Sequence, residues 1–80
     1  MTKNDYFESS ELSLASTLMC LGFKLDAVEK HNPKSLFVFR REESLDEAIQ
    51  GFWAGELRVE PKAFFNCIKE VKSRLYDNQD

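Results

Sequence analysis

The hydrophobic and polar positions of this chain follow two periods, one typical of strands and one typical of helices. Leu36-Phe37-Val38-Phe39 is a continuous apolar run between charged ends, too short for a helix and typical of a strand buried on both faces. Residues 23–30 alternate apolar and polar side chains, which predicts a half-buried strand. The four residues 31–34 between the runs are typical of a turn. We therefore expect an antiparallel hairpin with residues 36–39 as the central strand.

Three other stretches have the period of a helix. Residues 11–21 place Leu14, Leu18 and Leu21 on one side; Ser9 and Ser10 offer an N-cap, and Gly22 is a stop signal. The opposite side carries only small residues, which we expect to be solvated: Ser13, Ser16, Thr17 and Cys20. In the second helix, Ser44-Leu45-Asp46-Glu47 matches a capping box, and Gly55 marks the end.

The third helix is predicted to begin at Pro61, because proline lacks the N–H that the first helical position leaves unpaired. One face is apolar and is formed by Phe64, Cys67, Ile68, Val71 and Leu75. Phe65 and Tyr76 fall on the flank, beside Lys62, Lys69 and Lys72. This pattern predicts an amphipathic helix with an aromatic and basic flank.

Two short runs, Tyr6-Phe7 and residues 57–60, are candidate first and last strands. The predicted order is β-α-β-β-α-β-α, a small single α+β domain over residues 6–76. We expect an antiparallel sheet with helices on one face, ferredoxin-like or split βαβ in topology, and an extra C-terminal helix. Residues 1–5 and 77–80 are predicted to be disordered.

The composition limits the possible functions. The 80 residues include seven Phe, which supply a core without disulfides or a metal, and a net charge of -3 argues against a general polyanion binder. Cys20 and Cys67 are too few for a disulfide framework, and neither a signal peptide nor a membrane-spanning run is present. We therefore expect a cytoplasmic protein with reduced thiols.

No set of residues predicts catalysis, a metal or a cofactor. His31 is the single histidine and lies in a predicted turn, so no nucleophile and base are paired by spacing. Cys20, Cys67 and His31 are isolated in the sequence, whereas zinc sites commonly use paired ligands. The carboxylates of residues 42–43 and 46–47 precede or begin a helix, where they oppose its dipole. We expect no enzyme, no metal site and no cofactor.

The uncovered face of the sheet is the strongest functional signal. If Phe23, Leu25 and Ala27 face the helices, the other side of that strand shows Lys24, Asp26, Val28 and Lys30. The central strand adds either Phe37 and Phe39 or Leu36 and Val38, because both of its sides are apolar. An exposed apolar patch marks an interaction site or a missing layer. The third helix, a second copy of the chain or another ligand would cover it.

Residues 34–59, KSLFVFRREESLDEAIQGFWAGELRV, resemble the third strand, second helix and last strand of an RNA-recognition motif. The resemblance implies a shared topology. Aromatic side chains of that strand stack on bases in the family, and the equivalent residues here are Phe37 and Phe39. The family's glycine-flanked aromatic pattern is absent from this chain.

A second resemblance covers almost the whole chain. It rests on the opening YFESSELSLA of residues 6–15, on Leu18 with Gly22-Phe23, on residues 37–39, and on residues 55–61 before Phe64. Together these are similar to a family of small uncharacterised prokaryotic proteins that also occur in phage and mobile elements. The resemblance implies a prokaryotic or phage origin and no assigned activity.

The leading hypothesis is a non-catalytic binding or interaction module that self-associates, as a homodimer, through the sheet face or through the flank of the third helix around Phe65 and Tyr76. The alternative is a nucleic-acid-binding accessory protein. It would use Phe37 and Phe39 together with four basic residues: Lys24, Lys30, Arg40 and Arg58. Salt separates the two hypotheses, because phosphate contacts weaken steeply as salt rises whereas an apolar dimer holds or tightens.

Overall fold

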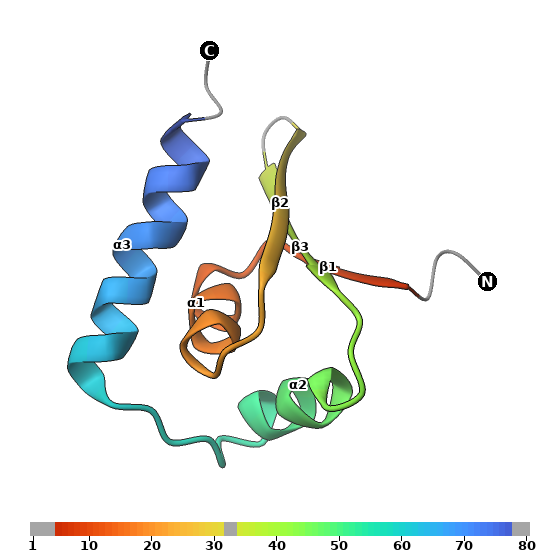
Figure 1. Ribbon diagram of the computed structural model, residues 1–80, viewed down its shortest axis with the longest axis vertical. Coiled ribbons are helices and arrows are strands. Elements are labelled where there is room, and N and C mark those ends of the chain that lie inside the picture. The colour runs from red at the N-terminus through yellow and green to blue at the C-terminus, as the bar shows by residue number, and fades with distance from the viewer. Residues whose placement is uncertain (1–4, 32–33, 78–80) are drawn as a thin grey trace.

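Strand β3 (Lys34–Arg40) lies in the centre of a three-stranded antiparallel sheet, as its continuous apolar run predicts. It pairs with β2 (Leu25–His31) on one side and with β1 (Tyr6–Ser9) on the other (Figure 1). The computed structural model describes residues 5–31 and 34–77. The predictions for residues 1–4, 32–33 and 78–80 lie outside the described residues.

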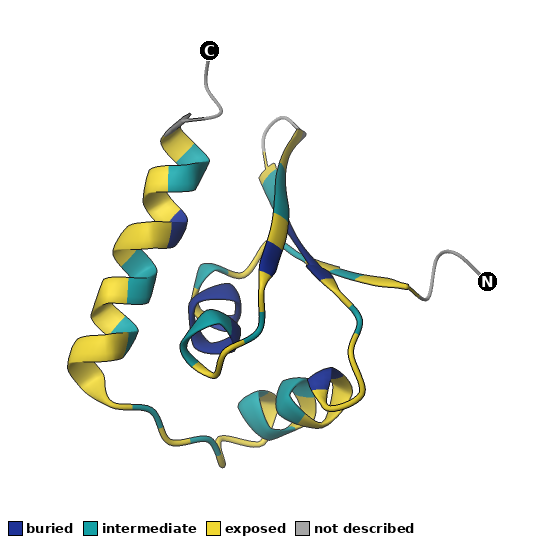
Figure 2. Ribbon diagram, in the orientation of Figure 1, coloured by how far each residue is buried: buried dark blue, intermediate teal, exposed yellow. Residues whose placement is uncertain are grey.

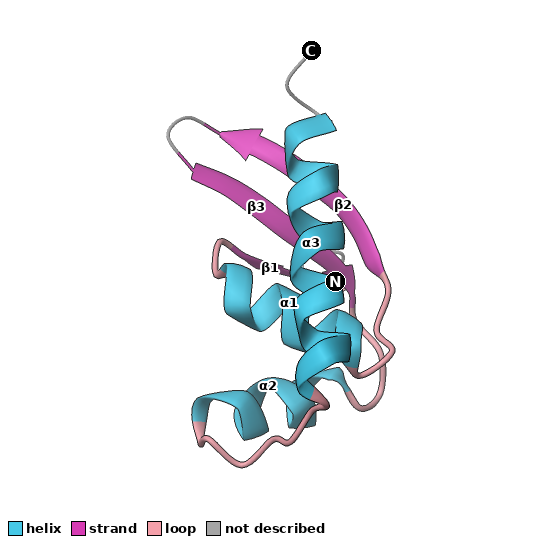
Figure 3. Cartoon of the chain, turned by 90° about the vertical axis from the view of Figure 1, so that its left-hand side faces the viewer, coloured by secondary structure: helices cyan, strands magenta, loops and turns pink. Residues whose placement is uncertain are grey.

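Three helices lie on one side of this sheet, in the order β1-α1-β2-β3-α2-α3. Helix α1 (Leu12–Cys20) covers one face, α3 (Pro61–Asp77) packs against α1 farther out, and α2 (Leu45–Trp53) lies at the end of the strands (Figures 1 and 3). Because β3 is antiparallel to both neighbours, β1 and β2 run parallel with β3 between them, which is a split βαβ unit. The predicted α+β class is confirmed.

The predicted last strand does not form. Residues 57–60 are irregular and connect α2 to α3. Their side chains contact the helices instead. Leu57 packs beside Gly51 of α2. Glu60 Oε1 accepts a hydrogen bond of 2.8 Å from the N–H of Ala63 in the first turn of α3. The sheet therefore has three strands, and β1 stays at its edge.

The core lies between β3 and the helices. Phe37 and Phe39 are 3% and 1% exposed and pack in one cluster with Leu14 and Leu18 of α1 and with Val71 of α3 (Figure 2). The covered face of β3 is therefore the phenylalanine face, and Leu36 and Val38 lie on the open one. The hypothesis that Phe37 and Phe39 form an exposed partner face is wrong, because burying two phenyl rings removes more apolar area from water.

The alternation predicted for β2 is interrupted by a β-bulge between Leu25 and Ala27. Leu25 is paired with Phe39 and Val28 with Phe37, so both lie on the covered face, whereas Ala27 is paired with Val38 on the open face. The prediction that Ala27 faces the helices and Val28 faces away is therefore wrong. One extra residue in the strand reverses the side on which every later residue lies.

The small-residue side of α1 is not solvated as a whole. Ser16 and Thr17 are 0% and 6% exposed, and α3 packs against α1. The Thr17 hydroxyl donates a hydrogen bond of 2.8 Å to the carbonyl of Ser13, whereas no partner for the Ser16 hydroxyl is found among the described residues. Small side chains let the α3 backbone approach, so the prediction of a solvated face fails at its centre.

The predicted helix ends are partly confirmed. Gly22, with φ of 104°, ends α1 in a Schellman motif: its N–H donates to Met19 and the N–H of Phe23 donates to Leu18. Ser44 is the N-cap of α2, but its side chain makes no cap hydrogen bond, so the capping box does not form. In the described part of the chain, no helix is long and apolar enough to cross a membrane.

Candidate functional site

The open face of the sheet is less apolar at its surface than the sequence predicts. Helix α3 does not fold across it, because Val71 and the other buried residues of the helices belong to the cluster on the opposite face. Val38 is nevertheless only 5% exposed, with Glu8 and Ala27 as its partners in the two neighbouring strands. Because its central residue is buried, the open face offers little apolar area there for a partner.

The outer face of α3 exposes two large aromatic side chains. Phe65 and Tyr76 are 57% and 58% exposed. They alternate with three exposed lysines at helical spacings of three and four residues, and we call this set the α3 stripe: Lys62, Phe65, Lys69, Lys72 and Tyr76. At 100° and 1.5 Å per residue the stripe occupies a sector of about 80° and runs for about 21 Å. It lies opposite the buried side of α3, which Cys67 and Val71 mark.

The α3 stripe combines positive charge with exposed ring faces. The ammonium group of Lys69 lies 5.0 Å from the ring centroid of Phe65, within the range of a cation–π contact. The stripe itself contains three lysines and no carboxylate. A partner with negative charge and room for two rings would complement this face.

A hollow of about 610 Å³ lies at the junction of β1, β3 and α2, and we call it the acidic pocket. It is lined by Asp5, Tyr6, Arg40, Arg41, Glu42, Glu43 and Asp46. Strand pairing holds it together, since the N–H of Arg41 donates a hydrogen bond of 2.7 Å to the carbonyl of Asp5. Four carboxylates against two guanidinium groups leave a net negative charge of two on this lining.

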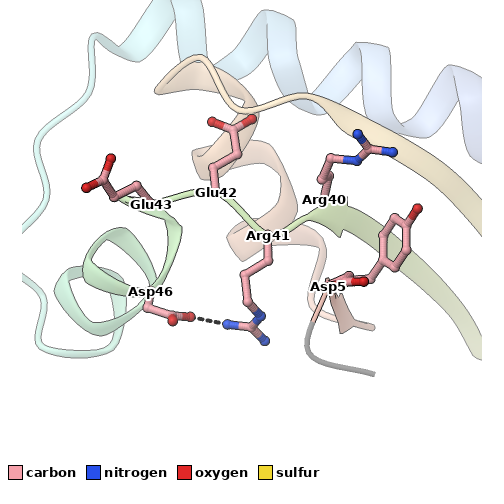
Figure 4. A pocket seen from close by; sticks show the side chains of 7 residues that line it. Asp5, Arg40, Arg41, Glu42, Glu43 and Asp46 are labelled. Carbon is pink, nitrogen blue, oxygen red and sulfur yellow. Dashed lines mark hydrogen bonds and ion pairs between the residues drawn. The ribbon is translucent and has the colours of Figure 1, made fainter. Parts of the chain in front are cut away.

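The two arginines of the acidic pocket are engaged within the chain. Arg41 forms an ion pair with Asp46, and its guanidinium lies 5.9 Å from the ring centroid of Phe7 (Figure 4). Arg40 lies 5.9 Å from the ring centroid of Tyr6, which raises the pKa of Arg40 through a hydrogen bond and the tyrosine charge. Figure 4 shows Glu42 and Glu43 turned away from the Arg41–Asp46 pair.

The α3 stripe and the acidic pocket lie on opposite flanks of the molecule. In Figure 1, α3 forms the left edge, whereas the segment from β3 to α2 that carries the pocket is on the right. The molecule therefore has a basic aromatic flank and an acidic hollowed flank. The net charge of -3 does not reveal this separation of basic and acidic surfaces.

The structure does not bring the sequence-predicted basic residues together. Lys24 precedes β2, Lys30 lies in β2, Arg40 ends β3 and Arg58 lies between α2 and α3; all four are exposed. With Phe37 and Phe39 buried, no single face joins these six residues. Phe65 and Tyr76 do share one face, as the sequence predicts.

Sequence reasoning missed the acidic pocket. The Arg40-Arg41-Glu42-Glu43 run is the available signal, but the sequence pattern attributes its carboxylates to the dipole of the following helix. Asp46 and Glu47 do lie in the first turn of α2, consistent with that assignment. Asp5 joins the pocket only because β1 pairs with β3, and no local sequence pattern predicts that pairing.

The two cysteines lie on helices that pack against each other, Cys20 at the end of α1 and Cys67 in α3. Burial raises the pKa of the Cys67 thiol, and the charge of Cys20 and a hydrogen bond with Cys20 raise it further. Both residues are half-buried. Within residues 5–31 and 34–77, no three Asp, Glu, His or Cys side chains converge as metal ligands.

Comparison with known proteins identifies a family. The family model described as a domain of unknown function (DUF5659) matches residues 4–77, and the chain belongs to this family. No curated protein and no solved structure gives a significant match. The family description assigns no activity, which agrees with the resemblance to uncharacterised proteins seen in the sequence.

Proposed function

We propose that this member of the DUF5659 family is a non-catalytic interaction module that self-associates in the cytoplasm, with the α3 stripe of one copy against the acidic pocket of the next. The observation that supports the proposal is the presence of two complementary surfaces on opposite flanks of one chain. The prokaryotic or phage provenance that the sequence resemblance implies belongs to the same proposal.

Charge complementarity favours this pairing over a pairing of like surfaces. If two α3 stripes met across a two-fold axis, the lysines of one copy would face the lysines of the other, and like charges in contact cost several kcal/mol. The acidic pocket instead presents the carboxylates of Glu42 and Glu43, for which no ion-pair partner is found among the described residues. Lysines of the α3 stripe of a second copy would neutralise these two carboxylates.

The exposed rings add the apolar part of the contact. Phe65 and Tyr76 leave more than half of their surface in water, and aromatic side chains are the residues that most often anchor protein interfaces. They lie about 16 Å apart along the helix axis, so both can contact one partner surface. Because the two surfaces lie on opposite flanks, each contact is heterologous, and copies add head to tail instead of closing as a symmetric pair.

A charge-swap experiment tests the proposal. The first variant carries Lys69→Glu and Lys72→Glu in the α3 stripe, and the second carries Glu42→Lys and Glu43→Lys in the acidic pocket. Each variant alone should be monomeric in multi-angle light scattering over a concentration series at low salt, because its two surfaces then repel. An equimolar mixture should associate again, since both kinds of contact become complementary.

The matched control carries Lys24→Glu and Lys30→Glu, which change the net charge equally at exposed positions outside the stripe. This control should associate as the wild-type chain does, and rising salt should weaken the association of both. Wild-type chain that is monomeric at every concentration at low salt would refute self-association. A mixture of the two swapped variants that stays monomeric would refute the assigned surfaces.

A second candidate function is supported by the α3 stripe itself. Lysines alternating with exposed aromatic rings are the residues with which proteins hold single-stranded nucleic acid, through phosphate contacts and base stacking. This alternative uses α3 and replaces the version based on Phe37 and Phe39, which are buried. Fluorescence anisotropy of a labelled single-stranded oligonucleotide separates the two functions. Binding that Lys69→Glu with Lys72→Glu abolishes, in a wild-type chain that is monomeric alone, favours nucleic acid.

A further inference from the structure

The two edges of the sheet differ in what contacts them. On the β2 side, Arg74 of α3 donates a hydrogen bond of 2.7 Å from Nη1 to the carbonyl of Leu25. Strand β1 forms the other edge, and residues 57–60, which the sequence predicts as a further strand, do not pair with it (Figures 1 and 3). Within the described part of the chain, β1 therefore has a strand on one side only.

The pairing register shows which backbone groups of β1 point away from the sheet. The N–H of Arg41 donates to the carbonyl of Asp5, so these two residues form a hydrogen-bonded pair. Such pairs recur at every second position of an antiparallel ladder, so the odd-numbered residues of β1 direct their backbone groups to β3. Tyr6 and Glu8 direct theirs outward. Both residues are exposed, and no other backbone hydrogen bond to them is found among the described residues.

We propose that the β1 edge binds an extended, basic segment of another protein, which joins the sheet as a fourth strand. Tyr6 and Glu8 offer two N–H donors and two C=O acceptors with the spacing of a strand. Backbone hydrogen bonds supply the affinity in this mode of recognition, and the side chains beside them supply the specificity. The inference goes beyond the proposed function and does not depend on it, because contacts of the α3 stripe use side chains.

The charge of the edge selects the occupant. Residues 5–9 contain the carboxylates of Asp5 and Glu8 and no basic side chain. A strand with lysine or arginine opposite these two positions gains opposite-charge pairs, and an apolar side chain opposite the half-buried Phe7 extends the covered face. Strand β1 of a second copy would instead bring the same carboxylates onto the neighbouring strand with no opposite charge. Charge therefore favours another protein over a second copy.

A peptide of sequence GTKVTKG is the probe. Paired antiparallel to β1, it places its lysines opposite Glu8 and Asp5 and its valine opposite Phe7. Hydrogen exchange of the full chain, measured by nuclear magnetic resonance at nine-tenths saturation, should slow about tenfold at the amides of Tyr6 and Glu8, because only the free fraction exchanges. The amide of Phe7 already bonds to β3 and should change less. Docking of the α3 stripe leaves the outward amides exposed, so the two proposals fail separately.

Two matched variants separate the backbone from the charge. Glu8→Pro removes an outward N–H that the pairing with β3 does not use, and proline is tolerated at such edge positions. Glu8→Thr removes the same charge and keeps the N–H. In fluorescence anisotropy of the labelled peptide, Glu8→Thr should bind about threefold more weakly than the wild-type chain, and Glu8→Pro about tenfold more weakly than Glu8→Thr.

A modified peptide gives the same test on the wild-type chain, independently of how the proline variant folds. Methyl groups on the backbone nitrogens of its first lysine and second threonine remove the N–H donors that face Glu8 and Tyr6, and its charge is unchanged. This peptide should bind at least about tenfold more weakly than the unmodified one.

Three results would overturn the inference. The first is unchanged exchange of the Tyr6 and Glu8 amides at millimolar peptide. The second is equal affinity of the methylated and unmodified peptides, because charge alone would then hold the segment. The third is protection of these two amides that grows with the concentration of the wild-type chain in the absence of peptide, because β1 would then pair with a second copy.

Discussion

Helix α3 contributes the fully buried Val71 to the core, and replacing that side chain tests the packing of the fold. Val71 is 0% exposed and belongs to the core cluster, whereas Phe65 on the same helix is 57% exposed. We predict that Val71→Ala destabilises the chain strongly and that Phe65→Ala, a larger truncation, does not.

The magnitude follows from the burial. Val71→Ala removes two carbon groups, worth about 1.6 kcal/mol of hydrophobic transfer at about 0.8 kcal/mol each. The cavity left beside Phe39 and Leu14 adds about 1 kcal/mol, which gives a total of about 2.5 kcal/mol. At Phe65 the loss of the contact with Lys69 is offset by the better helix propensity of alanine, so the net change stays within about 0.5 kcal/mol.

Urea unfolding followed by far-ultraviolet circular dichroism measures both free energies of unfolding, at high salt to suppress charge-driven association. A small domain has a total stability of about 5 kcal/mol, so Val71→Ala should remove about half of it and lower the melting temperature by roughly 10–20 °C. If Phe65→Ala proved as costly as Val71→Ala, the assignment of the buried and exposed faces of α3 would be refuted.

Three further predictions concern single positions. Ser16→Ala should raise the free energy of unfolding by about 0.5–1 kcal/mol, because it removes a buried hydroxyl without a partner and improves helix propensity; a loss of stability would reveal a missed hydrogen bond. Gly22→Ala should lower it by about 1 kcal/mol in the same assay through backbone strain at φ of 104°, since no atom lies within 4 Å of the added Cβ. The raised pKa of Cys67 means that the folded state holds the thiol proton more tightly than the unfolded state does. This contribution to stability is present below the pKa of the unfolded thiol and is lost as pH rises through the folded pKa. Cys67→Ser should therefore reduce the fall in the free energy of unfolding with rising alkaline pH, measured by urea unfolding across that range.

Local sequence determined the elements of this fold whose signals lie within one stretch of chain. The apolar run of residues 36–39 specified a central strand because no other short element buries both of its faces. Gly22 ended α1 because only glycine readily adopts its positive φ, and Pro61 began α3 because the first helical position needs no N–H. The exposed flank around Phe65 and Tyr76 was also evident from helical spacing alone.

Only the tertiary structure decided which contacts those elements make. Both faces of β3 are apolar, so the choice of Phe37 and Phe39 for the core depended on where the helices packed. The bulge in β2 moved the later side chains to the other face without a local signal. Residues 57–60 have strand-like alternation but do not pair with the edge strand β1. The acidic pocket joins residues that are distant in sequence. Such contacts follow from the burial of the whole chain, which no single stretch of sequence encodes.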